Sequence, residues 1–157
     1  MRIVKASTVA DFAIAGQLIQ EYRDYLVAEG IFECAAGNFD TEIQNPSRTY
    51  PSAQGGVYLA FDGDRPTGCA ALEEQTPGIG EVRRLFVRAD FRGRGLGREL
   101  IAFVVEDARS LGYRVIRLDT FRRIPYAQNI YLGLGFQEIP PYNELPRDKV
   151  IFLEQSL

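Results

Sequence analysis

Residues 81–112 read EVRRLFVRADFRGRGLGRELIAFVVEDARSLG and decide the fold class of this chain. The spacing of the apolar side chains predicts a strand over 81–87 and then a helix that begins near Leu96. Between them lies a basic, glycine-rich loop over 88–97, and Gly112 stands where glycine commonly ends a helix. A strand, a glycine loop and an amphipathic helix in this order indicate a mixed α/β fold.

The loop Arg92-Gly93-Arg94-Gly95-Leu96-Gly97 is expected to hold phosphate. Glycines allow close approach to a ligand, and the first N–H groups of a helix lack internal partners and favour an anion. A nucleotide P-loop is excluded because no Gly-Lys-Ser/Thr follows. The dinucleotide fingerprint fits poorly: Asp119 stands where its acid would, but the glycines are spaced G-x-G-x-G and begin five residues after the strand.

Arginines crowd the same stretch, and guanidinium groups match phosphate oxygens, so the run is expected to meet phosphate. The six arginines are Arg83, Arg84, Arg88, Arg92, Arg94 and Arg98. The net charge of −3 hides an asymmetry, because residues 1–80 carry five basic and eleven acidic side chains and residues 81–157 carry thirteen and ten. The basic run is small for a nucleic-acid footprint on an acidic protein, so no nucleic-acid partner is expected.

Outside residues 81–112, apolar periodicity and turn residues predict further elements, while residues 31–54 allow only a helical turn between loops. The predicted strands are 2–5, 57–61, 67–74, 115–119, 136–139 and 150–153, and the predicted helices are about 8–28 and 126–134. The resulting order is β-α-β-β-β-α-β-α-β-β with no linker, so residues 1–157 are expected to form a single domain.

Composition narrows the chemistry. The chain has 157 residues, 46% apolar and 25% charged, which is ordinary for one globular domain. It has no histidine, which excludes histidine triads, histidine-dependent metal sites and an imidazole base, and no metal is expected. Cys34 and Cys69 are too few for a disulfide framework or a zinc cluster and fit a reducing cytoplasm. No apolar run is long enough to predict a membrane span.

Two segments resemble one family. Arg92-x-x-Gly95-x-Gly97 after the strand EVRRLFV resembles motif A of the GNAT superfamily of acetyl-CoA-dependent N-acyltransferases, and AQNIYLGLGF, residues 127–136, resembles the family's A-x-x-L-Y-x-x-x-G-F segment. The order of elements agrees over essentially the whole chain. The resemblance implies an α/β (α+β) fold of one N-acetyltransferase domain, with a mixed six- to seven-stranded sheet flanked by helices and splayed at the cofactor slot.

The resemblance implies that acetyl-CoA binds to the loop and to the strand before it. By position, the cofactor-binding residues would be Leu85, Phe86, Val87, Arg92, Gly93, Arg94, Gly95, Leu96, Gly97 and Arg98. Which arginine meets the 3′-phosphate is left open. The asparagine that the family often carries three residues before Ala127 is Ile124 here, and Asn129 is out of register, so a side-chain contact to the pantetheine arm from that position is left open.

The implied reaction is direct attack of a primary amine on the thioester. By the same resemblance, Tyr131 is the general acid for the departing thiolate and Glu81 the general base for the amine. A phenol remains protonated at neutral pH, which suits the first role. Glu73, Glu74 or a water molecule are the alternatives to Glu81. Neither cysteine is expected to act as a nucleophile, because no histidine is present to form a thiolate.

The acceptor amine is not named by the sequence, which fits a small molecule or a peptide. The acidic first half would attract a cationic amine. Its pocket could be lined by Tyr22, Tyr25, Phe32, Phe39 and Tyr50. A non-catalytic acyl-CoA-binding sensor on the same fold is the alternative function. Exposed C-terminal strands are compatible with a homodimer, and no membrane partner is expected.

Overall fold

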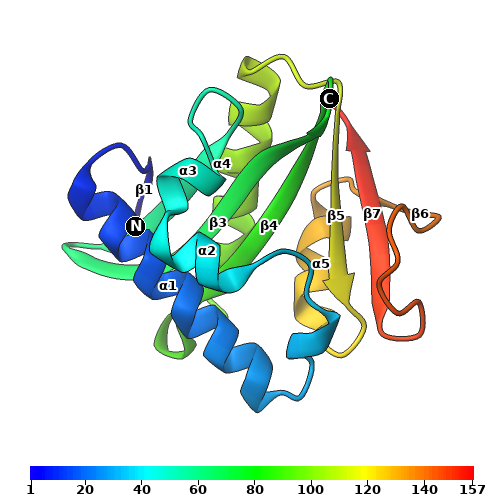
Figure 1. Cartoon of the computed structure of the whole chain (residues 1–157), viewed down its shortest axis with the longest axis horizontal. Helices are drawn as coiled ribbons and strands as arrows, with labels where there is room; N and C mark the ends of the chain where they lie inside the picture. The colour runs from blue at the N-terminus through cyan, green and yellow to red at the C-terminus, as the bar shows by residue number, and fades with distance from the viewer.

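A seven-stranded sheet covered by helices on both faces runs through the computed structural model, which describes residues 1–157 (Figure 1). The strands lie in the order β1-β2-β3-β4-β5-β7-β6. The elements in chain order are β1 (Arg2–Lys5), α1 (Val9–Ala28), α2 (Phe39–Gln44), α3 (Pro46–Thr49), β2 (Gly56–Asp62), β3 (Arg65–Thr76), β4 (Ile79–Val87), α4 (Leu96–Ser110), β5 (Val115–Phe121), α5 (Pro125–Gly133), β6 (Gln137–Ile139) and β7 (Val150–Ser156). The predicted fold class and order of strands are confirmed.

The sheet is mixed, because only β4 and β5 run parallel and every other neighbouring pair is antiparallel. A parallel pair needs a crossover, which α4 supplies between these two strands. Consequently the strand–loop–helix segment chosen from the sequence lies at the centre of the sheet, where the parallel pair forms.

Helices α1 and α2 cover one face of the sheet, and α4 and α5 cover the other (Figure 1). Each face has its own apolar core, with Leu18 and Phe39 in the first and Leu100 and Val104 in the second. Burial of these side chains provides the main stabilising free energy. Strand β4 lies between the two cores and contributes Phe86 to the first of them.

The ends of the long helices follow local sequence. The Asp11 N–H donates to Thr8 Oγ1 at 3.0 Å, and the Thr8 N–H donates to Asp11 Oδ2 at 3.1 Å, which forms a capping box at the start of α1. Gly95, at φ +82°, precedes the first residue of α4. The starts of α1 and α4 therefore lie where the sequence predicts helices to begin, near residue 8 and near Leu96.

Residues 31–54 contain more helix than the sequence predicts. A 3₁₀ turn at Phe32–Cys34 precedes α2 and α3. The side chain of Asn38 accepts a hydrogen bond from the Thr41 N–H at 3.2 Å and so starts α2, and Pro46 is the first residue of α3. Such short helices carry too little periodicity to be predicted from sequence, because they rest on caps and on packing against α1.

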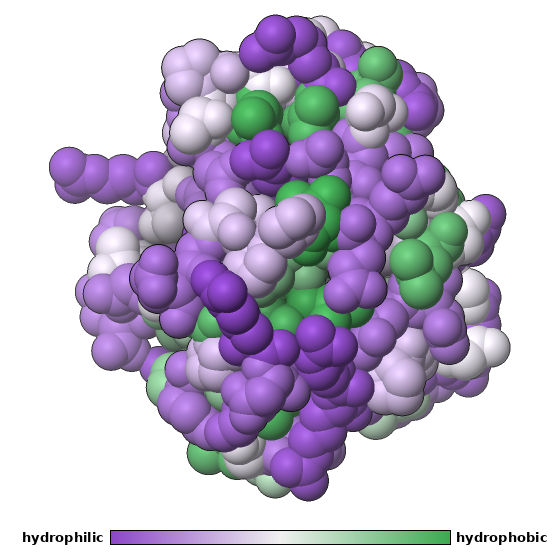
Figure 2. Space-filling model, turned by 90° about the vertical axis from the view of Figure 1, so that its right-hand side faces the viewer, coloured by the Kyte–Doolittle hydropathy of each residue, from purple (hydrophilic) through white to green (hydrophobic).

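The face beside β6 and β7 is mainly hydrophilic, with apolar residues gathered in smaller areas near its centre (Figure 2). No helix combines the length and the apolar character needed to cross a membrane.

A homodimer through the C-terminal strands stays a prediction.

Candidate active site

A slot opens between β4 and β5 because these two strands pair over only three residues. The pairs are Ile79 with Val115, Gly80 with Ile116 and Glu81 with Arg117, after which the strands diverge (Figure 1). The cavity that fills the divergence, called the slot below, is lined by Tyr22, Tyr25, Val82, Arg83, Arg84, Leu85, Phe86, Val87, Gly97, Asp119, Thr120, Phe121, Ile124, Tyr126, Ala127, Ile130 and Tyr131. The splayed sheet expected from the sequence is confirmed.

Strand β4 has a bulge at Arg84, beyond the last residue that pairs with β5. The pairing of β3 with β4 shifts register between Cys69 and Ala71, and Arg84 is the only residue other than glycine with a positive φ, 60°. An arginine pays a steric cost in this region, so packing must hold it there. The bulge lies where the slot begins and redirects the backbone of the residues that follow.

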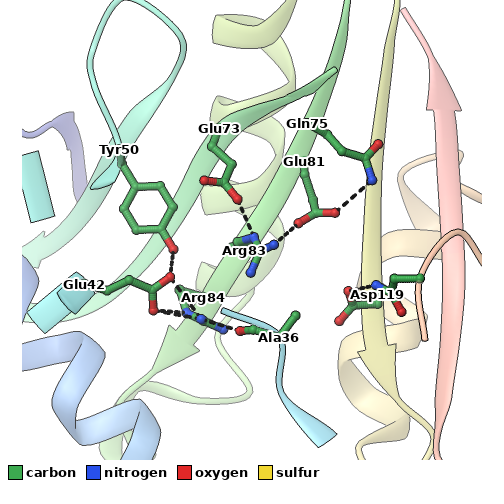
Figure 3. Close-up of polar contacts among 10 residues, drawn as sticks. Ala36, Glu42, Tyr50, Glu73, Gln75, Glu81, Arg83, Arg84 and Asp119 are labelled. Carbon is green, nitrogen blue, oxygen red and sulfur yellow. Dashed lines mark hydrogen bonds and ion pairs between the residues drawn. The ribbon is translucent and has the colours of Figure 1, made fainter. Parts of the chain in front are cut away.

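The side chain of Arg84 is anchored in a buried ion pair (Figure 3). Its Nε donates to Glu42 Oε2 at 2.9 Å, and its Nη2 donates to the carbonyl oxygen of Ala36 at 2.6 Å. The guanidinium stacks over the Phe39 ring at 3.8 Å, and the hydroxyl of Tyr50 also donates to Glu42. Helix α2 and the loop before it are thereby tied to the bulge of the central strand.

The glycine loop presents a row of free backbone donors. Gly93 and Gly95 have φ of +76° and +82°, a region that favours glycine. None of the six N–H groups from Gly93 to Arg98 donates to another backbone group, whereas the N–H of Arg92 donates to Ala89 at 3.3 Å. Because these donors lie at the N-terminus of α4, they form a site for an anion.

The six arginines divide into two sets, so the expectation that the whole run meets phosphate is wrong for three of them. Arg83, Arg84 and Arg88 form ion pairs with carboxylates, the last with Glu21 at 2.6 Å. The second set comprises Arg92, Arg94 and Arg98, and none of the three pairs with a carboxylate in the chain.

The second set lies around the glycine loop. Arg92 Nε donates to the carbonyl oxygen of Val87 at 2.8 Å, and its guanidinium lies over the Tyr25 ring at 4.8 Å. Arg98 Nη1 donates to the carbonyl oxygen of Gly133 at 3.1 Å. Arg92 and Arg98 both border the cavity beside the loop, which puts two unpaired positive charges near the free N–H groups.

Tyr131 reaches the slot from α5. Its side chain is buried and packs edge-to-face on Phe136, with ring centroids 5.7 Å apart. Burial raises the pKa of the Tyr131 phenol above its usual value, so the group stays protonated. Ile124 is also buried and lines the slot, whereas Asn129 is exposed and does not. Tyr131 therefore brings a protonated phenol to the wall of the slot.

Glu81 lies at the root of the slot rather than inside it. It is 3% exposed, and its carboxylate pairs with Arg83 Nη2 at 2.6 Å and accepts from Gln75 Nε2 at 3.3 Å (Figure 3). Glu73 pairs with the same guanidinium through Nε at 2.6 Å. Glu74 is exposed.

These glutamates border a second cavity, called the acidic hollow below. It is lined by Ala36, Glu73, Glu74, Gln75, Glu81, Arg83, Tyr142, Asn143, Glu144 and Leu145. Four carboxylates and one guanidinium line it, so the hollow has an excess of negative charge. Arg83 lines both the hollow and the slot, which therefore adjoin.

Asp119 is a slot residue whose part in the site the sequence reasoning missed. It lies on β5, across the gap from Arg83, and accepts one hydrogen bond, from Asn143 Nδ2 at 3.4 Å (Figure 3). Burial, with the nearby Glu81, raises the pKa of this carboxyl to about 6. The feature of the sequence that could have indicated this role is an acidic residue at the end of a predicted strand. From the sequence alone, that residue is considered only as a possible ribose ligand.

The aromatic residues predicted to line an acceptor pocket separate in space. Tyr22 and Tyr25 line the slot. Phe39 and Tyr50 are buried in the core on the α1 face, and Phe32 is partly exposed with its ring 5.5 Å from that of Phe39. Three of the five thus belong to the packing of α2 rather than to either cavity.

Comparison with known proteins identifies the fold and the family. The model of the acetyltransferase (GNAT) family matches residues 17–136. An N-acetyltransferase of Schizosaccharomyces pombe that lacks a described function is 32% identical over 142 residues, which cover 89% of this chain and 85% of that protein. The chain spans about half the length of several N-acetyltransferases of Rattus norvegicus that it also matches.

Solved structures agree with this fold at low sequence identity. An acetyltransferase of Streptococcus agalactiae superposes with a TM-score of 0.80 at 18% identity, covering 99% of this chain and 98% of the other. An acetyltransferase of Salmonella typhimurium, solved with its cofactor acetyl-CoA, superposes with a TM-score of 0.75 at 17% identity, covering 99% and 92%. The open parallel pair at the centre of the sheet is thus part of a recurrent architecture.

Proposed function

This chain belongs to the GNAT family of acetyltransferases, and on that premise we propose that it transfers an acetyl group from acetyl-CoA to a primary amine. The observation that carries the proposal is a single opening that joins three features. A row of free N–H groups lies at one end, Tyr131 lines the wall, and the acidic hollow adjoins. Residues 1–157 act as one catalytic domain, which one continuous sheet supports.

The glycine loop suits the pyrophosphate of coenzyme A. Free N–H groups from Gly93 to Gly97, at a helix N-terminus, are donors of the kind that phosphate oxygens accept. Arg92, Arg94 and Arg98 add positive charge that no carboxylate in the chain neutralises. Leu85, Phe86 and Val87 lie beyond the last β4–β5 pair, so their backbone is free of β5 and available to the pantetheine arm. Acetyl-CoA, when bound, supplies an activated acetyl group as a thioester.

Tyr131 serves the leaving thiolate. The phenol is buried in the slot wall and its raised pKa keeps it protonated, so its O–H is available to donate to the departing sulfur. The same helix carries Tyr126, which is half exposed at the slot.

The acceptor amine enters from the side of the acidic hollow. Its excess of carboxylates attracts a cation, so the proposed acceptor is a cationic amine on a small molecule or a peptide. An amine cation must lose a proton before it attacks, and Glu81 remains the base expected from the sequence. The free, buried cysteines Cys34 and Cys69 fit the predicted cytoplasmic location.

A turnover assay tests the proposal. Purified protein with acetyl-CoA is offered a panel of polyamines, amino acids, aminoglycosides and peptides, and CoA release is followed. We expect turnover with cationic amines, and turnover of neutral or anionic amines alone would contradict the acceptor class. Binding of acetyl-CoA without turnover of any amine would support a non-catalytic acyl-CoA sensor instead.

Tyr131→Phe and Tyr126→Phe form a matched pair on α5. Loss of the donor at position 131 should lower kcat about a hundredfold, the lower end of general acid contributions, while the Kd for acetyl-CoA measured by calorimetry stays the same. The kcat of Tyr126→Phe should stay within about twofold of the wild-type value, because the proposed reaction involves no proton transfer by the Tyr126 hydroxyl. Full kcat in Tyr131→Phe would remove Tyr131 from the mechanism.

A further inference from the structure

We propose that Asp119 is the carboxylate that accepts the proton of the acceptor amine, and that Glu81 instead holds Arg83 beside it. This assignment rests on the proposed acetyl transfer and replaces the base expected from sequence. It concerns residues on the two diverging strands, Asp119 on β5 and Glu81 on β4.

The first argument is position along the strands. Glu81 pairs with Arg117 in the last rung of the β4–β5 ladder, so Glu81 lies where the sheet is still closed. Asp119 is two residues beyond Arg117 and on the same face of β5, since side chains alternate along a strand. Asp119 therefore lies in the open part, and it lines the slot together with Tyr131. Glu81 lines only the acidic hollow.

The second argument is which carboxylate is free to accept a proton. Glu81 is ion-paired to Arg83 and also accepts a hydrogen bond from Gln75, so both of its carboxylate oxygens already have partners. Glu73 is paired to the same guanidinium. Asp119 has no ion pair, and its one hydrogen bond is the long one from Asn143.

The surroundings of Asp119 suit a base that works near neutral pH. Burial is the main cause that raises its pKa to about 6, Glu81 acts in the same direction, and Arg83 opposes them. The titratable and charged groups that face it are Glu81, Arg83 and Arg84 on β4, Tyr22 on α1, Tyr131 on α5 and Tyr142 in the segment before β7. At pH 7 and above Asp119 is mostly ionised and can accept a proton.

The step balances with two side chains. Asp119 takes one proton from the ammonium group of the acceptor, which leaves an amine with a free electron pair. The nitrogen bonds to the thioester carbonyl carbon as the bond from that carbon to sulfur breaks. The sulfur keeps the electron pair and takes the proton of the Tyr131 hydroxyl. The second proton that leaves the nitrogen then restores the Tyr131 hydroxyl. Asp119 then releases its proton to water.

The arrangement places the two proton transfers on opposite sides of the sheet. Asp119 lies on the face of β5 that Arg117 shares, toward the acidic hollow from which the amine enters. Tyr131 belongs to the core on the α4 and α5 side. Asp119 thus takes the first proton of the acceptor amine from one face, and Tyr131 protonates the departing thiolate from the other and regains its proton from the nitrogen as the amide forms.

Asp119→Asn and Glu81→Gln test the assignment. Asparagine keeps the size of the side chain and can still accept from Asn143. With an amine found active, kcat/KM is measured from pH 5 to pH 9. The wild type should lose rate below about pH 6 as the Asp119 base becomes protonated. Asp119→Asn should lose that pH limb and about a hundredfold in kcat at pH 7.5, and Glu81→Gln should keep the limb.

Two readouts independent of turnover accompany the rates. Carboxyl ¹³C NMR of the free protein should show one aspartate that titrates near pH 6 and that disappears in Asp119→Asn. Calorimetry should give both variants the wild-type Kd for acetyl-CoA, which shows an intact slot. A limb that persists in Asp119→Asn and vanishes in Glu81→Gln would assign the base to Glu81 and overturn the inference. Absence of turnover in the wild type would refute the proposed function itself.

Discussion

The arginines of β4 and the arginines of the glycine loop occur in one run of sequence and have opposite surroundings. Arg83, Arg84 and Arg88 each meet a carboxylate within 2.7 Å. Arg92 and Arg94 lie over aromatic rings, Tyr25 and Phe91, and pair with no acid in the chain. An arginine-rich segment can therefore stabilise the fold with some of its charges and bind a ligand with others. The carboxylates that the fold brings close decide which arginines are left for a ligand.

The ion pairs of the first set of arginines also change how the charge difference between residues 1–80 and residues 81–157 is interpreted. Three acidic residues of the first half, Glu21, Glu42 and Glu73, are neutralised by arginines of β4 and its end. The two halves are thus partly joined by ion pairs instead of forming one acidic and one basic region. The arginines of the loop pair with no carboxylate, and in the acidic hollow Glu74 and Glu144 have no ion-pair partner.

Breaking the buried pair of the first set should have the largest effect. In Arg84→Met the nearly unexposed Glu42 loses its partner, and we expect the free energy of unfolding in urea to fall by about 3–5 kcal/mol. The double variant Glu42→Gln with Arg84→Met should lose less, because no buried charge is left alone. Arg94→Met is the control from the second set and should unfold like the wild type. A loss below about 1 kcal/mol in Arg84→Met would contradict the difference between the sets.

A buried acid without an arginine partner should cost stability. The pKa of Asp119 is raised to about 6 in the folded state from an unfolded value of 3.8, so its charge disfavours folding above pH 6, and this penalty disappears below pH 4. Asp119→Asn should therefore raise the free energy of unfolding by about 3 kcal/mol at pH 8 and by little at pH 4. Urea unfolding at both pH values is the measurement, with exposed Asp24→Asn as the control. An equal effect at both pH values would disprove the linkage.

The loop can be disturbed without touching any arginine. Gly95→Ala forces a side chain into a left-handed conformation at φ +82°, a strain of about 1–2 kcal/mol, and should weaken acetyl-CoA binding about tenfold. Gly112→Ala carries similar strain at φ +88° at the other end of α4. Calorimetry should find unchanged affinity in that variant. Equal losses in both would mean that the loop geometry is not specific to the ligand.

The smallest effect is expected from a single exposed charge of the second set. Arg94→Ala should weaken acetyl-CoA binding about threefold at low salt, and the difference should shrink at high salt because exposed charges are screened. Arg109→Ala, at the far end of α4 and paired with Glu106, is the control. An effect of Arg94→Ala that is independent of salt would assign this residue a direct, buried contact.

Local sequence patterns predicted the elements and part of the site. The glycine loop needs only the free N–H groups and positive φ angles of its own residues, and Tyr131 lies in a segment whose resemblance to a family is visible in ten letters. The partners of Arg84 were out of reach, because Glu42 is 42 residues away and belongs to a short helix. Asp119 was visible as a residue, but its environment comes from β4, α1 and the segment before β7.

The sequence by itself determined the α/β order of elements and the glycine loop with its free N–H groups at the start of α4, because periodicity, glycine conformation and unpaired helix donors are local properties. Tertiary structure alone decided which arginines are free, where β4 leaves β5 and which carboxylate enters the slot. Those outcomes depend on Coulomb energy and desolvation, which change with burial and with distance to groups far away in the chain. The type of a residue therefore indicates which chemistry its side chain can perform. The groups packed around that side chain decide whether it can perform that chemistry in the folded protein.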